Sequence, residues 1–300
     1  MRLRWLALWG WSVVACAPRR APEATPPPPC AEGARRRLFR APDPTQTCLD
    51  RADAAFARRA EPGLLAAAIE TLLQAQSIAP SDPRVLERMA RAYATRAYAH
   101  PEGQVSDYLT AREQGLRCLV LAPDFAGAVA NAGGLITRLA LRALEPSAAG
   151  CLRWTTLAWA RWLQSLGVAG AAIDLDILHA MARRVVELSG PDALAEAQAL
   201  LGLVVALPPR DAKLQDAEAA FAASRSANPG DLTPRVDLAE LVYGRQGQTD
   251  LWRQTLETVA QADLDEADPL LLENRRAVAR ARAALELGAP DPEAWYRLRP

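Results

Sequence analysis

Apolar residues recur at helical spacing from about residue 50 to about residue 285, and this pattern predicts a protein built from helices. The helical stretches are rich in alanine and leucine and are separated by proline and glycine, which end helices. No β-branched run keeps the apolar–polar alternation of a strand. We therefore expect an all-α fold.

The helices are expected to repeat, because a tetratricopeptide-like set of residues recurs. This pattern places small residues where two helices cross closely, a bulky residue between them and a proline after the second helix. Three such sets occur, and each continues into the helix that follows it. The first is Ala68, Leu72, Ala75 and Pro80, continued by Leu86, Ala90 and Tyr93. The second is Ala111, Cys118 and Pro123, continued by Ala132 and Gly133, and the third is Ala217, Phe221, Ser224 and Pro229, continued by Leu238 and Ala239. Gly115 stands at the bulky position of the second set. We expect antiparallel helix pairs stacked into a right-handed α-solenoid with a concave binding surface.

The first residues predict export with a lipid anchor. Arg2 and Arg4 precede an apolar stretch from Trp5 to Ala15, which is too short to span a bilayer and is typical of a signal peptide. Val13-Val14-Ala15-Cys16 resembles the lipobox of bacterial lipoproteins, which implies cleavage before Cys16 and lipidation of that residue. The alternative is an ordinary secretory signal with a chance cysteine.

Four parts follow along the chain. Residues 1–15 are the predicted signal peptide, and residues 16–48 are a lipidated cysteine with a tether. Eight prolines between residues 18 and 44 favour an extended spacer there. Residues 49–290 form the repeat domain, and residues 291–300 a C-terminal tail.

The charge balance excludes one class of partner. Basic and acidic residues number 35 each, and removal of Arg2 and Arg4 with the signal peptide leaves 33 basic against 35 acidic side chains. No basic excess remains to hold phosphate backbones, so nucleic-acid binding is not expected.

Four cysteines remain after Cys16, namely Cys30, Cys48, Cys118 and Cys151. An oxidising compartment permits disulfides, and four cysteines allow three pairings. We favour a bond between Cys30 and Cys48, because it would tie the entry segment to the folded domain. The sequence has no CxxC motif or Cys/His cluster, so no metal or redox site is expected.

Trp154, Trp159 and Trp162 lie on one predicted helix within an arc of roughly 140°. An indole offers a large apolar surface and one N–H donor, which suits a protein core or the wall of a ligand pocket. Such a stripe is more often core, and a ligand-binding role for the three tryptophans is the alternative. Gly167 and Gly170 are expected to end this helix, and Asp174 to cap the next.

No set of residues predicts catalysis. His100 and His179 are far apart, and neither stands in a HExxH or triad-like context. Asp174 and Asp176 lie at a predicted helix start, where carboxylates usually favour the helix dipole. The motifs GxxxxGK[ST], GxGxxG and GxSxG do not occur in the sequence. We expect no enzymatic activity and no cofactor.

The C-terminal half carries a family resemblance. The resemblance rests on a series of segments in a fixed order. They are Ala217-x-x-x-Phe221, Pro234 to Glu240, Trp252 to Leu256, Asn274-Arg275-Arg276-Ala277 and Arg280-Ala281-Arg282. Two further segments, Trp154 to Trp162 and Leu200 to Pro209, precede this series. This order resembles the TatT component family, the tetratricopeptide lipoproteins associated with TRAP (tripartite ATP-independent periplasmic) transporters, over roughly residues 64–285. The family's glycine pair before the Ala217 helix is replaced here by Arg-Asp-Ala-Lys at 210–213.

The resemblance implies a periplasmic homotrimer that docks the transporter's substrate-binding protein and passes a small hydrophobic or organic-acid ligand through a central pore. Ala17 is not the aspartate that retains some lipoproteins at the inner membrane, so the outer membrane is expected. The alternative is a pilotin-like or envelope-assembly lipoprotein that binds polypeptide. A hydrophobic lining with few charges would favour the transport role, and a groove rich in Asn and Arg would favour the assembly role.

Overall fold

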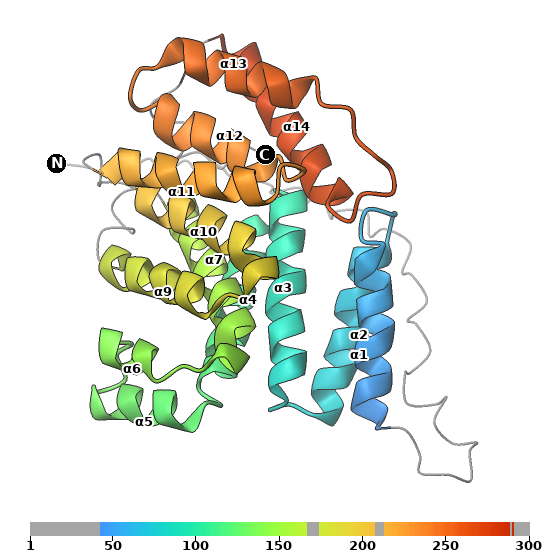
Figure 1. Ribbon diagram of the computed structural model, residues 1–300. Coiled ribbons are helices and arrows are strands. Elements are labelled where there is room, and N and C mark those ends of the chain that lie inside the picture. The colour runs from blue at the N-terminus through green and yellow to red at the C-terminus, as the bar shows by residue number, and fades with distance from the viewer. Residues whose placement is uncertain (1–42, 167–173, 208–212, 289, 291–300) are drawn as a thin grey trace, which may run out of the picture.

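The computed structural model describes residues 43–166, 174–207, 213–288 and 290. These residues form 13 α-helices and no strand, which confirms the predicted all-α class (Figure 1). The α-helices are α1 (Pro44–Ala57), α2 (Leu64–Ile78), α3 (Pro83–Ala99), α4 (Gln104–Leu119), α5 (Pro123–Asn131), α6 (Arg138–Arg142), α7 (Ala149–Leu166), α9 (Leu175–Leu188), α10 (Leu194–Ala206), α11 (Leu214–Ala227), α12 (Thr233–Leu238), α13 (Thr249–Ala260) and α14 (Leu271–Glu286). A π-helical turn, Ala239–Tyr243, continues α12.

The first helix begins earlier than the predicted tether allows. Asp43 is the N-cap of α1 and its carboxylate accepts the Thr45 N–H at 3.0 Å, while Pro44 takes the first helical position. Proline suits that position because its missing N–H has no intrahelical acceptor there. The boundary at residue 48 is therefore wrong, and α1 already buries Cys48 and Leu49. The predicted signal peptide, Cys16, most of the tether and the tail at 291–300 lie outside the described residues.

Consecutive helices pack as pairs, and the last helix returns to the first ones. Consecutive pairs in extensive contact are α1 with α2, α3 with α4, and α10 with α11, and α7 packs as extensively on α4 and also contacts α3. The C-terminal helix α14 packs on α3, at the end of the molecule where the α1–α2 turn also lies (Figure 1). Arg59 after α1 donates two hydrogen bonds to Glu273 of α14, each 2.8 Å. The last described helix therefore returns to the N-terminal helices.

Several small residues lie in closely packed parts of the fold. Ala68 and Ala75 of α2 are fully buried. Gly115, which breaks the pattern, lies against α7, where a Cβ would come within 3.1 Å of the Thr155 backbone. On α10, Gly202 makes room for the ring of Phe221, which would lie 2.9 Å from an added Cβ. The glycines thus mark places where the backbones come closer than a side chain allows.

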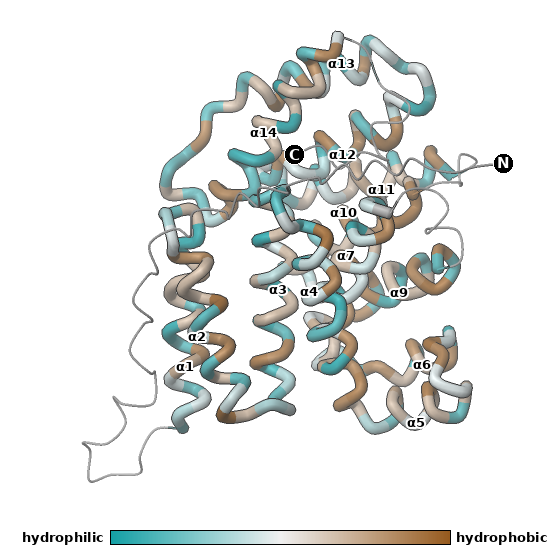
Figure 2. The backbone as a smooth tube through the Cα atoms, turned by 180° about the vertical axis from the view of Figure 1, so that it is seen from behind, coloured by the Kyte–Doolittle hydropathy of each residue, from teal (hydrophilic) through white to brown (hydrophobic). Residues whose placement is uncertain are grey.

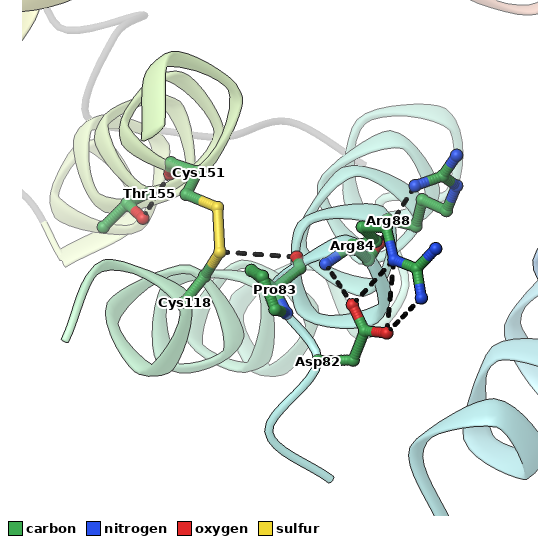
Figure 3. The surroundings of a disulfide bond; sticks show 7 residues. All are labelled: Asp82, Pro83, Arg84, Arg88, Cys118, Cys151 and Thr155. Atoms are coloured by element: carbon green, nitrogen blue, oxygen red, sulfur yellow. Dashed lines mark hydrogen bonds and ion pairs between the residues drawn. A yellow bond between two sulfur atoms is a disulfide. The ribbon is translucent and has the colours of Figure 1, made fainter. Parts of the chain in front are cut away.

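A disulfide joins Cys118 of α4 to Cys151 of α7, next to the crossing at Thr155 (Figure 3). Both cysteines are almost fully buried. Cys48 is also disulfide-bonded and fully buried. Cys30 lies outside the described residues, so the pairing of Cys30 with Cys48 stays a prediction.

The main hydrophobic core runs from α3 to α14, and two smaller clusters lie between α1, α2 and α3 and between α3, α4 and α7. Burial of these apolar faces is the main driving force for stacking the helices. Among the described residues, no helix has both the length and the apolar character that a membrane span requires.

Candidate ligand-binding site

A cavity of about 290 Å³ lies between the helices. Its walls come from α1, α3, α4, α7, α10, α12 and α14, so that helices from both ends of the chain enclose it. Glu273 of α14 and Arg59 after α1 both line it, and their ion pair joins the two ends of the wall. The cavity thus depends on the return of α14 to the N-terminal helices.

Four aromatic side chains line this cavity: Phe56, Tyr98, Tyr108 and Trp154. Burial raises the pKa of Tyr98 and raises that of Tyr108 to about 12, so both phenols are neutral at ordinary pH. The hydroxyl of Tyr98 lies 3.4 Å from Thr233 Oγ1. These rings offer flat apolar surface to a ligand.

Trp154 differs from its two neighbours on α7. Its Nε1–H is buried and has no acceptor among the described residues. Trp159 lies in the main core, 7% exposed, and donates from Nε1 to Asp174 Oδ2 at 3.1 Å. Trp162 is half-buried, and the Arg112 guanidinium stacks over the rings of both Trp159 and Trp162. Of the three predicted tryptophans, only Trp154 lines the cavity.

Asp174 precedes α9, as expected, but its side chain does not cap that helix. Its carboxylate instead accepts the indole N–H of Trp159, which fixes the position of that ring between α7 and α9. Gly167 and Gly170, expected to end α7, lie outside the described residues. His100 follows the end of α3 and is exposed, whereas His179 lies on α9.

Arginines stack on the aromatic side chains of the cavity, and Arg91 and Arg153 make the closest such contacts with Phe56 and Trp154. Arg91 lies over Phe56 at 4.1 Å and pairs with Asp53 at 2.9 Å, and Arg153 lies over Trp154 at 4.8 Å and pairs with Glu196. Burial lowers the pKa of both guanidinium groups, which remain charged at any ordinary pH. The Nε–H of each is buried without an acceptor in the described parts of the chain.

A buried ion-pair network forms another part of the wall. Asp237 of α12 accepts from Arg161 of α7 at 2.5 Å and from Arg280 of α14 at 3.0 Å. Arg280 also pairs with Glu240 at 2.5 Å, and Gln164 accepts from Arg161 at 3.0 Å. Two carboxylates thus face two guanidiniums, and the network is satisfied without a ligand. It joins α7, α12 and α14 behind the cavity.

Asp231 lines the cavity just before α12 and belongs to no ion pair among the described residues. Burial raises its pKa, although its carboxylate accepts the Thr233 N–H at 2.9 Å.

Residues quoted for the family resemblance have structural contacts here. Asp237 and Arg280 meet in the buried network. The Asn274 side chain accepts the Leu232 N–H and donates to the Gly230 carbonyl oxygen, each at 2.9 Å, which holds the turn before α12 against α14. These residues shape the cavity wall rather than fill it.

Most of the cavity lining escaped the sequence analysis. The lining residues come from helices between α1 and α14, and no spacing along the chain connects those of α3 with those of α7, α10 and α12. One signal was available for the network: Asp237 lies between Val236 and Leu238 on an apolar helix, where an isolated charge indicates a buried partner.

Within the described residues, no group of histidine, cysteine, aspartate or glutamate side chains is arranged to hold a metal ion. Comparison with models of known protein families and with curated proteins finds no match to this chain. What the cavity binds must therefore be inferred from its own residues.

Proposed function

We propose that this chain is a ligand-binding helical-repeat protein and that its cavity takes a small molecule with an apolar body and oxygen acceptors, such as an organic acid. The buried Nε1–H of Trp154 is the observation that carries this proposal. A buried donor without an acceptor costs roughly 1–3 kcal/mol, and a bound oxygen would remove that cost. The buried Nε–H groups of Arg91 and Arg153 also have no acceptor, but so does that of Arg225, which lies away from the cavity. The two arginines therefore give weaker support to the proposal than Trp154 does.

The stacked-repeat arrangement is part of the proposal. Fully buried Ala68, Ala75 and Ala217 occupy the small positions of the tetratricopeptide pattern, and Phe221 occupies a bulky one. In a solenoid of helix pairs the concave side is the usual binding surface, and we propose that the cavity lies on that side.

The size of the cavity favours a small molecule over a polypeptide. Ligand pockets for small molecules begin near 300 Å³, whereas a docked peptide helix or strand needs an open groove. The lining is mixed, because aromatic rings stand beside four arginines and four acidic residues, so the charge of the lining does not separate the transport role from the assembly role. The small volume of the cavity supports the transport role.

We propose further that the protein acts beside a TRAP transporter, as a lipid-anchored periplasmic component that presents its ligand to the substrate-binding protein. The resemblance to the TatT component family supplies this partner. The disulfide between Cys118 and Cys151 supports export, because such bonds persist in oxidising compartments.

Calorimetric titration with a panel of aliphatic and aromatic carboxylates, alongside the corresponding amines, tests the ligand class. We expect carboxylates to bind and amines not to bind. The substitution Trp154→Phe keeps the ring and removes the N–H, so it should weaken binding by about 1–2 kcal/mol. Trp162→Phe is the matched control, because Trp162 does not line the cavity. Binding of amines alone, or equal losses in both variants, would refute the proposed ligand class.

The partner is tested separately by capture of purified TRAP substrate-binding proteins on the immobilised full chain. Retention of such a protein supports the transport role. If carboxylates bind but no substrate-binding protein is retained, the cavity proposal stands and the TRAP assignment fails.

A further inference from the structure

A second concave region lies away from the cavity, between α6 and α9. It is a groove of about 700 Å³ lined by five basic side chains, Arg138, Arg142, Arg183, Arg184 and Lys213, and by only two acidic ones, Asp176 and Glu187. Its net charge is therefore positive on a chain whose basic and acidic residues balance overall.

Most of these cations are not used by the fold. Arg184 donates to Glu187 and to the carbonyl oxygens of Arg142 and Leu144, so it holds α9 against the end of α6. By contrast, Arg138, Arg142, Arg183 and Lys213 are exposed, and their side chains form no ion pair with any described residue. Exposed guanidiniums with no internal partner are available to an external anion.

Two leucines next to the groove are unusually exposed. Leu139, between Arg138 and Arg142, is 71% exposed, and Leu135 just before α6 is 68% exposed. They are the most exposed large apolar side chains among the described residues. Helix geometry places Leu139 within roughly 100° of both arginines of α6, so leucine and cations share one exposed face.

The sequence around them has no negative charge. From Phe125 to Leu144 the chain contains no aspartate or glutamate, and its only charged residues are Arg138 and Arg142. This segment includes most of α5, whose first turn also carries the exposed Asp124, and all of α6; both helices lie at one end of the molecule in both views (Figure 2). α5 buries only Phe125, so the segment is thinly covered.

We infer that this surface, formed by the α5–α6 segment and the basic groove beside α9, docks on an anionic lipid bilayer. Unpaired arginines would contact the lipid phosphates, and Leu135 and Leu139 would insert among the headgroups, as at interfacial protein surfaces. A bilayer accepts isolated leucines without a shaped pocket, whereas an acidic protein would need a matching cavity for each. The combination of bare leucines with free cations therefore favours lipid.

The test compares co-sedimentation of the full chain with vesicles of phosphatidylcholine alone and of phosphatidylcholine mixed with phosphatidylglycerol. The double variant Arg138→Glu, Arg142→Glu should lower binding to the mixed vesicles by at least about tenfold, since each cation near such a surface contributes on the order of 1 kcal/mol. Arg253→Glu with Arg282→Glu is the matched control. It makes the same charge change on exposed residues of α13 and α14, at the opposite end of the molecule (Figure 1).

A third variant, Leu135→Ser with Leu139→Ser, leaves every charge in place and should weaken binding to the mixed vesicles severalfold. The N-terminal residues are identical in all four proteins, so differences between variants report on this surface alone. Wild-type binding by the α6 double variant would overturn the proposal. A second outcome would also overturn it. If the α6 double variant binds vesicles like the wild type but no longer binds an immobilised acidic polypeptide, the surface docks on a protein instead.

Discussion

Gly115 of α4 lies so close to Thr155 of α7 that a Cβ on Gly115 would come 2.1 Å from the Thr155 hydroxyl oxygen. The Gly115→Ala variant should therefore be destabilised by about 1–3 kcal/mol, because the crossing cannot widen freely beside a disulfide. Urea unfolding measures this change. Thr155→Ala in the same chain should restore part of the loss, and strict additivity of the two substitutions would show that the residues do not meet.

Replacement of the buried carboxylate of Asp237 should lower the free energy of unfolding by about 3–5 kcal/mol. Asp237→Asn leaves Arg161 and Arg280 without their shared counter-charge, and removal of one member of a buried ionic group is costly. Chemical unfolding near neutral pH provides the measurement. A variant as stable as the wild type would mean that this network is not closed in solution.

The same residue predicts a pH dependence. Burial alone would raise the pKa of Asp237, but Arg161 and Arg280 outweigh it and hold the pKa below its ordinary value. A depressed pKa stabilises the fold fully above the unfolded value, which is about 3.9, and this stabilisation is lost as the pH falls toward the folded pKa. The difference in stability between wild type and Asp237→Asn should thus be constant near neutrality and shrink below about pH 4. A difference that grows in acid would reverse the assigned sign.

Trp159 and Trp154 should respond differently to replacement by phenylalanine. Trp159→Phe removes a buried hydrogen bond to Asp174 and some core volume, so thermal unfolding should show a loss of about 1–3 kcal/mol. Trp154→Phe removes only an unpaired N–H and should change stability by less than about 1 kcal/mol. Equal losses would place both rings in the core.

Removal of the disulfide should destabilise the protein by roughly 3–4 kcal/mol, the loop-entropy value for cysteines 33 residues apart. The double variant Cys118→Ser, Cys151→Ser avoids a stray thiol, and unfolding under non-reducing conditions compares it with the wild type. Because α4 and α7 also pack at Gly115, the variant should keep its helical circular dichroism.

Helical periodicity was sufficient to predict the fold class, and the small residues of the repeat pattern at Ala68, Ala75 and Ala217 are fully buried in the structure. These features are local, so they leave a signal within one or two helices. Proline density misled at Pro44, because a proline that disrupts the middle of a helix is well placed at its first position.

The cavity could not be predicted in the same way. Trp154 was identified as one of three equivalent indoles, and nothing in the spacing of α7 separates it from Trp159, since the difference lies in what packs opposite each ring. Tyr98 of α3 and Asp237 of α12 meet around the cavity only because α14 returns to α3. Contacts over such separations depend on the curvature of the whole stack, which is the sum of many small packing angles.

The ion pair between Arg59 and Glu273 also determines when during folding the cavity can exist. The two residues are 214 positions apart, and the entropy of closing so long a loop opposes their contact until the intervening helices are in place. Helix pairs such as α1 with α2 can form while the chain is still being synthesised, but the part of the wall that includes Glu273 arrives only with the last helix. The cavity is therefore completed only at the end of folding, in one late step in which α14 must meet the residues that follow α1.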